Sequence, residues 1–114
     1  MNVSDVIYGN TLARWNALEA SVQSGFNQAE LPSEVVMVID YNEELFRRAA
    51  AAFGATIVVK NVSTKGLSGA RNSGVVASSG EVVAFLDDDA FADPTWLEKL
   101  TKPLVDPLVC GTGG

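Results

Sequence analysis

Histidine is absent from the 114 residues, and Cys110 is the single cysteine. Without histidine, Ser-His and Cys-His nucleophilic machinery is excluded within the chain, and so is a zinc site of the usual His/Cys type. One cysteine cannot form an internal disulfide, and Cys110 is interpreted as a small buried hydrophobe because it stands in an apolar run. Any metal site in this chain therefore has to be built from oxygen ligands.

Positive charge and long apolar runs are also scarce. Lys and Arg total 8 against 14 Asp and Glu, for a net charge of -6, and no basic run occurs. A nucleic-acid partner is not expected, because such partners are bound by clustered positive charge. The sequence has no signal-like N-terminus and no run of 18 apolar residues. These features predict a cytoplasmic location, either free or at the cytosolic face of a membrane.

What the sequence does contain is an alternation of strand-like and helix-like segments. Apolar and β-branched runs predict strands at 3–8, 35–39, 56–59 and 81–86, with a fifth at 104–110. Helical spacing predicts helices at 12–26 and 43–53, a third that Ser68 caps and that ends near Gly80, and a fourth that starts at Asp93-Pro94. This order predicts an α/β fold, namely a three-layer α/β/α single domain over 1–114 around a mainly parallel sheet.

Polar residues follow several of these strands directly. Tyr8, Asp40 and the triplet Asp87-Asp88-Asp89 all stand at strand ends, and parallel α/β sheets bind ligands at the carboxyl ends of their strands. Three adjacent carboxylates repel one another, and a hard divalent cation relieves that repulsion. Oxygen ligands without histidine suit Mg2+ or Mn2+. The alternative, that the aspartates only end a strand and solvate a loop, stays open.

A second candidate segment runs from Lys65 to Asn72, with two glycines at a helix start. Backbone N–H groups there favour anions, and Lys65 or Arg71 can pair with phosphate. The plainer interpretation is that the glycines allow close packing and that Arg71 is a solvated charge. Asp40 has two interpretations as well, because it can accept hydrogen bonds from a base or ribose or cap the next helix. Trp15 and Trp96 are interpreted as core residues.

At this point the residues resemble a known family. Ala70-Arg71-Asn72-Ser73-Gly74, Ser79-Gly80-Glu81, Phe85-Leu86-Asp87-Asp88-Asp89 and Pro94-Thr95-Trp96-Leu97 resemble the A-R-N-x-G, G-E, F-L-D-x-D and P-x-W-L pattern of family 2 glycosyltransferases of the GT-A fold. The resemblance covers nearly the whole chain. It implies the Rossmann-like nucleotide-binding half of that fold, and inverting transfer of a sugar from a nucleotide diphosphate donor to an acceptor hydroxyl with a divalent metal.

The resemblance also implies roles for single residues. Asp89 is similar to the family's principal metal ligand, Asp87 to the first acid of D-x-D, and Asp88 to an acid near the ribose. Asp40 resembles the first acid of the motif that ends the second strand. The implied nucleotide-sugar-binding set is thus Tyr8, Asp40, Lys65, Arg71, Asp87 and Asp88, and the implied metal ligands are Asp87 and Asp89.

The chain departs from the family pattern in several places. Tyr8-Gly9-Asn10-Thr11 replaces the usual Thr-x-Tyr/Phe-Asn, Asp5 interrupts the first strand, and Tyr41 stands where a second acid is usual. These changes leave the nucleotide base undetermined. The acceptor (glycan, lipid or protein) is also undetermined. No residue is assigned as the general base, which the family normally takes from a part beyond this chain.

Two further functions are compatible with parts of the pattern. One is a non-catalytic sugar-nucleotide-binding or assembly module, for which an exposed sheet edge would favour a homodimer. The other is a haloacid-dehalogenase-like phosphatase, but that family carries its D-x-D after the first strand, whereas the aspartates here follow the fourth. The sequence therefore favours the donor-binding domain of a glycosyltransferase.

Overall fold

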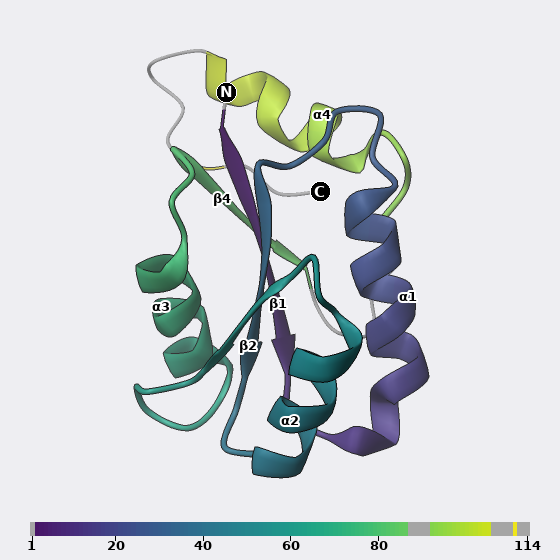
Figure 1. Cartoon of the computed structure of the whole chain (residues 1–114). Helices are drawn as coiled ribbons and strands as arrows, with labels where there is room; N and C mark the ends of the chain where they lie inside the picture. The colour runs from purple at the N-terminus through teal and green to yellow at the C-terminus, as the bar shows by residue number, and fades with distance from the viewer. Residues whose placement is uncertain (1, 87–91, 106–110, 112–114) are drawn as a thin grey trace.

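The computed structural model describes residues 2–86, 92–105 and 111, and strands and helices alternate along it (Figure 1). In chain order the elements are β1 (Val3–Gly9), η1 (Leu12–Arg14), α1 (Trp15–Phe26), β2 (Glu34–Ile39), α2 (Glu43–Ala52), β3 (Ile57–Lys60), α3 (Leu67–Ala77), β4 (Val82–Leu86), α4 (Trp96–Thr101) and η2 (Lys102–Val105), where η marks a short 3-10 helix. The four described strands agree with the predicted ones to within one residue at each end.

The strands form one parallel sheet in the order β3-β2-β1-β4. β2 is buried from Val35 to Ile39, which explains its unbroken apolar run, because a strand covered on both faces needs no polar alternation. The prediction of a mainly parallel sheet is confirmed.

Helices cover both faces of this sheet (Figure 1). On one face Ile7 and Met37 pack with residues of α1 and α2, including Leu18 and Leu45. On the other face the core cluster consists of Val6, Val36 and Val38 with Ala70 of α3. Leu97 of α4 packs on Val3 and Ala84, beside α1. The three-layer α/β/α prediction is therefore confirmed.

The start of α3 differs from the prediction. Ser68 does not cap this helix, since the N-cap is Gly66 and the helix begins at Leu67 and ends at Ala77. Gly66 has a φ of 115°, a backbone conformation that glycine adopts readily and other residues rarely do. The cap position is therefore set by the backbone of the preceding loop, and Ser68 lies exposed in the first turn.

The C-terminal part also differs. The helix expected from Asp93-Pro94 begins two residues later, at Trp96, and Asp93 Oδ1 instead accepts hydrogen bonds from the N–H and hydroxyl of Thr95 in the turn before it. The strand expected at 104–110 is wrong at its first two residues, which belong to the 3-10 helix η2. Proline at 103 has no N–H to donate to a sheet and fits this tight turn. Residues 106–110, including Cys110, lie outside the described residues.

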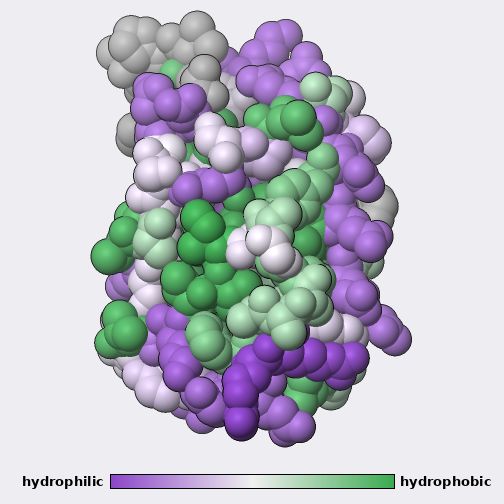
Figure 2. Space-filling model, in the orientation of Figure 1, coloured by the Kyte–Doolittle hydropathy of each residue, from purple (hydrophilic) through white to green (hydrophobic). Residues whose placement is uncertain are grey.

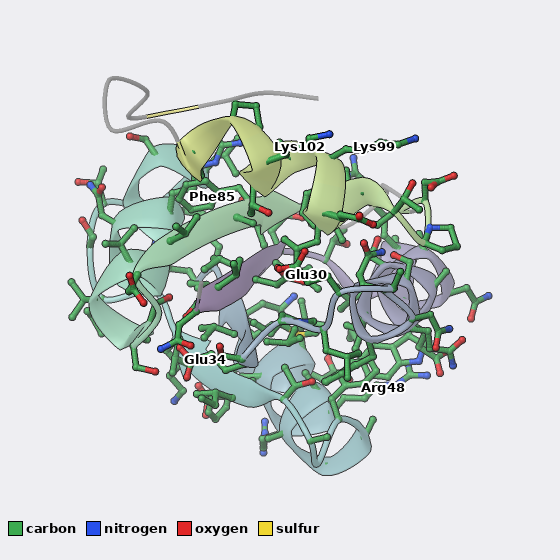
Figure 3. All side chains as sticks on the ribbon, turned by 90° about the horizontal axis from the view of Figure 1, so that it is seen from above. Glu30, Glu34, Arg48, Phe85, Lys99 and Lys102 are labelled. Atoms are coloured by element: carbon green, nitrogen blue, oxygen red, sulfur yellow. The ribbon has the colours of Figure 1, made fainter. Side chains whose placement is uncertain are left out.

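The two tryptophans pack as core residues. Trp15 is buried and stacks on Phe53 with ring centroids 5.2 Å apart, and the Arg48 guanidinium lies 4.0 Å from its ring centroid (Figure 3). Trp96 is partly buried against the core. Apolar side chains also reach the surface near α3 (Figure 2), where Val59, Val62 and Val76 line a groove of about 380 Å³. Within the described part of the chain, no helix is both long and apolar enough to span a bilayer.

Candidate functional site

The register of the sheet brings the carboxyl ends of all four strands to the same side of the sheet, which we call the strand-end edge. Gly9 of β1 pairs with Ile39 of β2, which pairs with Lys60 of β3, and Leu86 of β4 pairs with Ile7. Because the strands are parallel, the residues that follow them leave the sheet on the same side. The predicted convergence of the strand ends is therefore confirmed for the described residues.

The acidic triplet, with the predicted positions Asp87, Asp88 and Asp89, lies outside the described residues. Its flanks are held in place by the fold. Leu86 is fixed by its pairing with β1. On the far side the Ala92 N–H donates to Ser24 Oγ at 3.0 Å, and Gln28 Nε2 donates to the Asp93 carbonyl at 2.8 Å. Ser24 lies in the last turn of α1 and Gln28 follows that helix, so the end of α1 anchors the chain directly after the segment that contains the triplet.

Asp40 follows β2 and is 4% exposed. Its Oδ2 accepts a hydrogen bond from the Tyr8 hydroxyl at 3.0 Å and another from the Gly66 N–H at 3.0 Å. Its Oδ1 accepts from Asn61 Nδ2 at 2.8 Å. Asp40 therefore joins the ends of β1, β2 and β3 to the start of α3, and the expectation that it caps α2 is wrong, because Asn42 fills that role.

Asn61, which no sequence pattern singled out, is the second centre of this network. Besides Asp40, its Nδ2 donates to the Thr64 carbonyl at 2.9 Å, and its Oδ1 accepts from the Ser63 N–H at 2.9 Å and from Ser73 Oγ at 2.8 Å. Ser73 Oγ also accepts from the Val62 N–H at 3.2 Å. The only signal in the sequence was an asparagine directly after a strand, which is common in ordinary turns.

The loop 61–66 packs tightly on the first turn of α3. A Cβ on Gly69 would lie 1.7 Å from the Thr64 carbonyl oxygen, so no larger residue fits there without moving the loop. Lys65 is exposed in this loop. The glycines thus allow close packing, as the plainer interpretation of the sequence had it, and the loop presents Lys65 at the same edge as Asp40.

Arg71 lies one turn into α3 and is placed near β4. Its guanidinium carbon is 5.1 Å from the ring centroid of Phe85, a residue labelled in Figure 3. Arg71, Phe85 and Tyr8 line one small depression together with Leu67. Two predicted site residues, Tyr8 and Arg71, therefore line the same depression, and Asp40 accepts a hydrogen bond from the Tyr8 hydroxyl.

Among the described residues other than glycine, Tyr41 alone has a φ in the left-handed region, at 50°. Its hydroxyl donates to the Ser63 carbonyl at 2.5 Å, so this bond ties the residue after Asp40 to the loop 61–66. Tyr41 also lines a groove of about 370 Å³ with Lys60 and Glu43. These two form an ion pair at 2.7 Å, and the hydrogen bond from Lys60 lowers the pKa of Glu43. The left-handed φ of Tyr41 is a strained backbone conformation, and such strain is often found in functional segments.

One buried acid lies below this edge, on β1. Asp5 is 0% exposed, and neither of its carboxylate oxygens has a hydrogen-bond partner among the described residues. Burial without a partner raises the pKa of Asp5 to about 7. Its side chain faces α1, since a Cβ on Gly25 would lie 3.4 Å from Oδ2.

The metal ligands predicted from the sequence, Asp87 and Asp89, lie outside the described residues. Among the described residues, no group of three or more His, Cys, Asp or Glu residues is arranged to hold one. The sequence has no histidine, and its acidic triplet offers carboxylate oxygens as ligands. Carboxylates fit Mg2+ and Mn2+, which complete their coordination with phosphate oxygens and water.

Comparisons with known proteins identify the family of this chain. The model of glycosyl transferase family 2 matches residues 8–113. A glucosyl-dolichyl phosphate glucuronosyltransferase of Haloferax volcanii is 37% identical over 103 residues, which cover 88% of this chain and 33% of that protein. A glycosyltransferase of Bacillus subtilis, YwdF, is 33% identical, with 91% of this chain and 38% of that protein covered. The chain thus spans about a third of the length of these two relatives.

Solved structures with the same fold include two glycosyltransferases. A mannosyltransferase of Pyrobaculum calidifontis, in complex with GDP-Man and Mn2+, matches with a TM-score of 0.76 and 24% identity over 95% of this chain and 33% of that one. Glucosyl-3-phosphoglycerate synthase of Mycobacterium tuberculosis, with Mn2+, UDP and phosphoglyceric acid, matches with a TM-score of 0.74 and 21% identity over 92% of this chain and 39% of that one. With its parallel sheet, its strand-end site and these matches, the chain belongs to glycosyl transferase family 2 and has the GT-A fold.

Proposed function

We propose that this chain is the donor-binding part of a glycosyltransferase and binds a nucleotide diphosphate sugar together with Mg2+ or Mn2+. The observation that carries the proposal is the convergence of Tyr8, Asp40 and Leu86, the residue directly before the acidic triplet, at one edge of a parallel sheet. The family match over residues 8–113 supports it, as do two proteins of the same fold that were solved with nucleotides and Mn2+.

Each part of the site has a proposed task. Asp87 and Asp89 hold the metal ion, and Asp88 lies near the ribose. Lys65 and Arg71 approach the diphosphate from the loop 61–66 and α3, where their positive charges offset its negative charge. Tyr8, near the end of β1, contacts the nucleoside. The chemistry that a bound metal ion supplies is charge neutralisation and Lewis-acid assistance to the leaving nucleotide.

The transfer step itself is proposed only for a chain that also carries the parts of the relatives that have no counterpart here. The expected reaction is inverting transfer of the sugar to an acceptor hydroxyl, which needs a general base to take the proton of that hydroxyl. No described residue at the strand-end edge is assigned this role, because Asp40 is engaged by three internal donors. The chain alone is therefore expected to bind donor and to transfer little or no sugar.

Calorimetric titration tests the proposal. UDP and GDP are titrated, each with and without Mn2+, into the wild type, Asp89→Ala and Glu81→Ala. Glu81 is exposed at the start of β4, at the opposite edge of the sheet, so its variant matches the loss of charge without touching the site.

The expected result is Mn2+-dependent binding of at least one nucleotide, weakened about 100-fold or more in Asp89→Ala because the metal loses a charged ligand, and unchanged in Glu81→Ala. Binding that is equal with and without Mn2+, or equal in all three proteins, would contradict the proposed metal site.

A further inference from the structure

The carboxylate of Asp40 is occupied by the protein itself. It is 4% exposed, and three donors contact its two oxygens: Asn61 Nδ2 at 2.8 Å, the Tyr8 hydroxyl at 3.0 Å and the Gly66 N–H at 3.0 Å. An ionised carboxylate offers about four acceptor positions. The three donors take most of these positions, and a side chain that is 4% exposed leaves a nucleotide little access to the remaining one.

The side-chain amide of Asn61, which donates to Asp40, cannot rotate away without losing hydrogen bonds. Asn61 is 5% exposed and all four of its hydrogen-bonding positions are used, two donated by Nδ2 and two accepted by Oδ1. A buried amide that is fully satisfied keeps one orientation, because turning it over leaves buried donors facing donors. The Asp40–Asn61 contact is therefore a fixed point on which the loop 61–66 is built.

This fixed point determines where the exposed basic groups lie. Asp40 holds the N–H of Gly66, which directly follows Lys65 and is the N-cap of α3. The same helix carries Ser73, bonded to Asn61, and Arg71. Asp40 thus sets the position of both basic residues through the backbone and through Asn61.

We propose that Asp40 is a positioning residue that acts on the bound nucleotide diphosphate through Tyr8 and the loop 61–66 and does not itself contact the nucleotide. This inference rests on the proposed function and deepens it. It assigns Asn61 and Ser73 to the donor site as supporting residues, and it differs from the role that the sequence resemblance implied for Asp40.

A rescue experiment separates the two roles. In Asp40→Asn the new amide nitrogen faces Asn61 Nδ2, so two donors meet and the contact is lost. In the double variant Asp40→Asn/Asn61→Asp the donor and acceptor exchange sides. The amide oxygen at position 40 can still accept from Tyr8 and Gly66, and the carboxylate at position 61 still accepts from Ser63 and Ser73. The double variant thus restores the contact between positions 40 and 61 while position 40 stays neutral, and it gives up the bond from position 61 to the Thr64 carbonyl, which then faces an acceptor.

The measurements are calorimetric affinity for UDP and GDP with Mn2+, and NMR exchange of the Gly66 amide proton without ligand. We expect Asp40→Asn to weaken the affinity about tenfold, the effect of about one hydrogen bond, and to speed Gly66 exchange. We expect the double variant to recover part of both, because the contact between positions 40 and 61 returns while the bond to the Thr64 carbonyl does not. A double variant that binds as weakly as Asp40→Asn although its Gly66 amide is protected again would overturn the proposal, because position 40 would then need its charge for the ligand.

A second variant leaves Asp40 untouched. Ser73→Ala removes the hydrogen bond to Asn61 and the one from the Val62 N–H. Ser78→Ala at the other end of α3 removes the bond from Ser78 Oγ to the Gly74 carbonyl. Positioning predicts that Ser73→Ala weakens nucleotide affinity about threefold and that Ser78→Ala does not. Equal affinity in both would contradict it.

The two proposals can fail separately. A wild type that binds neither nucleotide would contradict the proposed function and, with it, the action of Asp40 on a nucleotide. The exchange of Gly66 in Asp40→Asn and the double variant would then still decide whether Asp40 holds the loop.

Discussion

At the scale of single residues, Asp5 is an acid that the fold removes completely from water. It lies in the central strand β1, fully buried, with no hydrogen-bond partner among the described residues. The cause of its raised pKa is desolvation, since burial disfavours the charged form. Burying the charged carboxylate without a partner costs free energy, so Asp5 lowers stability at any pH where it is ionised.

The sign of the pH dependence follows from this pKa. The pKa of Asp5 is 3.8 when unfolded and about 7 when folded, so at pH values between the two the unfolded state releases a proton that the folded state keeps. Stability is therefore expected to fall as pH rises from about 4 to about 7, by on the order of 4 kcal/mol in all. The sequence has no histidine, so no other side chain has an ordinary pKa within the upper part of this window.

Urea unfolding at pH 5 and pH 8 measures this effect. The wild type is expected to be more stable at pH 5 by a few kcal/mol, and Asp5→Asn is expected to lose most of that difference because it cannot ionise. Glu98→Gln, which neutralises an exposed acid on α4, is the control and should keep the wild-type difference. An equal pH response in wild type and Asp5→Asn would show that Asp5 is not buried in its acid form.

At the scale of elements, the packing of α3 on the sheet depends on a residue without a side chain. A Cβ on Gly74 would lie 2.5 Å from Val6 Cγ1 and 3.1 Å from Val38 Cγ2. Gly74→Ala is therefore expected to push α3 away from the sheet and to lower the free energy of unfolding by about 1–3 kcal/mol. Urea unfolding measures it.

Gly54→Ala is the matched control, because no atom would lie within 4 Å of its new Cβ. Its free energy of unfolding is expected to change by about 0.5 kcal/mol or less. Equal stability of the two alanine variants would mean that α3 does not pack as closely as described. Because Arg71 and Ser73 lie on the same helix, Gly74→Ala is also expected to disturb the donor site.

The contact between α1 and α4 depends on one buried amide. Gln28 is 6% exposed; its Nε2 donates to the carbonyls of Ser24 and Asp93, and its Oε1 accepts from the Leu97 N–H at 2.9 Å. Gln28→Ala leaves the Asp93 carbonyl and the Leu97 N–H without these partners. It is expected to lower the free energy of unfolding by about 2–4 kcal/mol.

Chemical unfolding of Gln28→Ala beside Gln23→Ala tests this contact, because Gln23 is exposed on α1. Gln23→Ala should be close to wild type. A similar small effect of both substitutions would show that the segment after the acidic triplet is held by other contacts.

Elements whose signal is local were predictable from the sequence. The buried run 35–39 located β2 to within one residue, because a continuous apolar run of this length in an α/β chain is typical of a central parallel strand. The cap of α3 was not predictable in this way, since it depends on the φ of Gly66 and on the packing of the loop below it. The expected strand at 104–110 was wrong at its start for a similar reason, because apolar residues beside a proline fit a 3-10 turn equally well.

The residues of the candidate site were also predictable only where a local sequence pattern marked them. Tyr8 and Asp40 were found because strand ends are visible in the sequence and parallel topology brings them together. Asn61 and Ser73 were missed, because their roles come from contacts across 21 and 12 residues of chain that no local pattern encodes. The sequence thus indicates a candidate ligand site, and the structure adds which residues hold that part of the fold in shape.

At the scale of the whole molecule, the candidate site is concentrated at one end of an elongated domain of 42 × 27 × 20 Å. The carboxyl ends of the strands carry Tyr8 and Asp40, and the opposite end carries Ser33 and Glu81 beside the strand starts. About two thirds of the length of the two relatives named above has no counterpart in this chain. Under the proposed function, donor and metal binding belong to the strand-end edge, and acceptor activation is assigned to no described residue.

The most direct test of this assignment is to locate Mn2+ on the protein. The ion is paramagnetic, so bound Mn2+ broadens the NMR signals of nearby amides. With UDP present, the amides of Tyr8 and Gly66 are expected to broaden, those of Ser33 and Glu81 to stay sharp, and excess Mg2+ to reverse the effect. Broadening centred at the Ser33 and Glu81 end, or no broadening at saturating Mn2+ and UDP, would contradict a metal-dependent donor site at the strand ends.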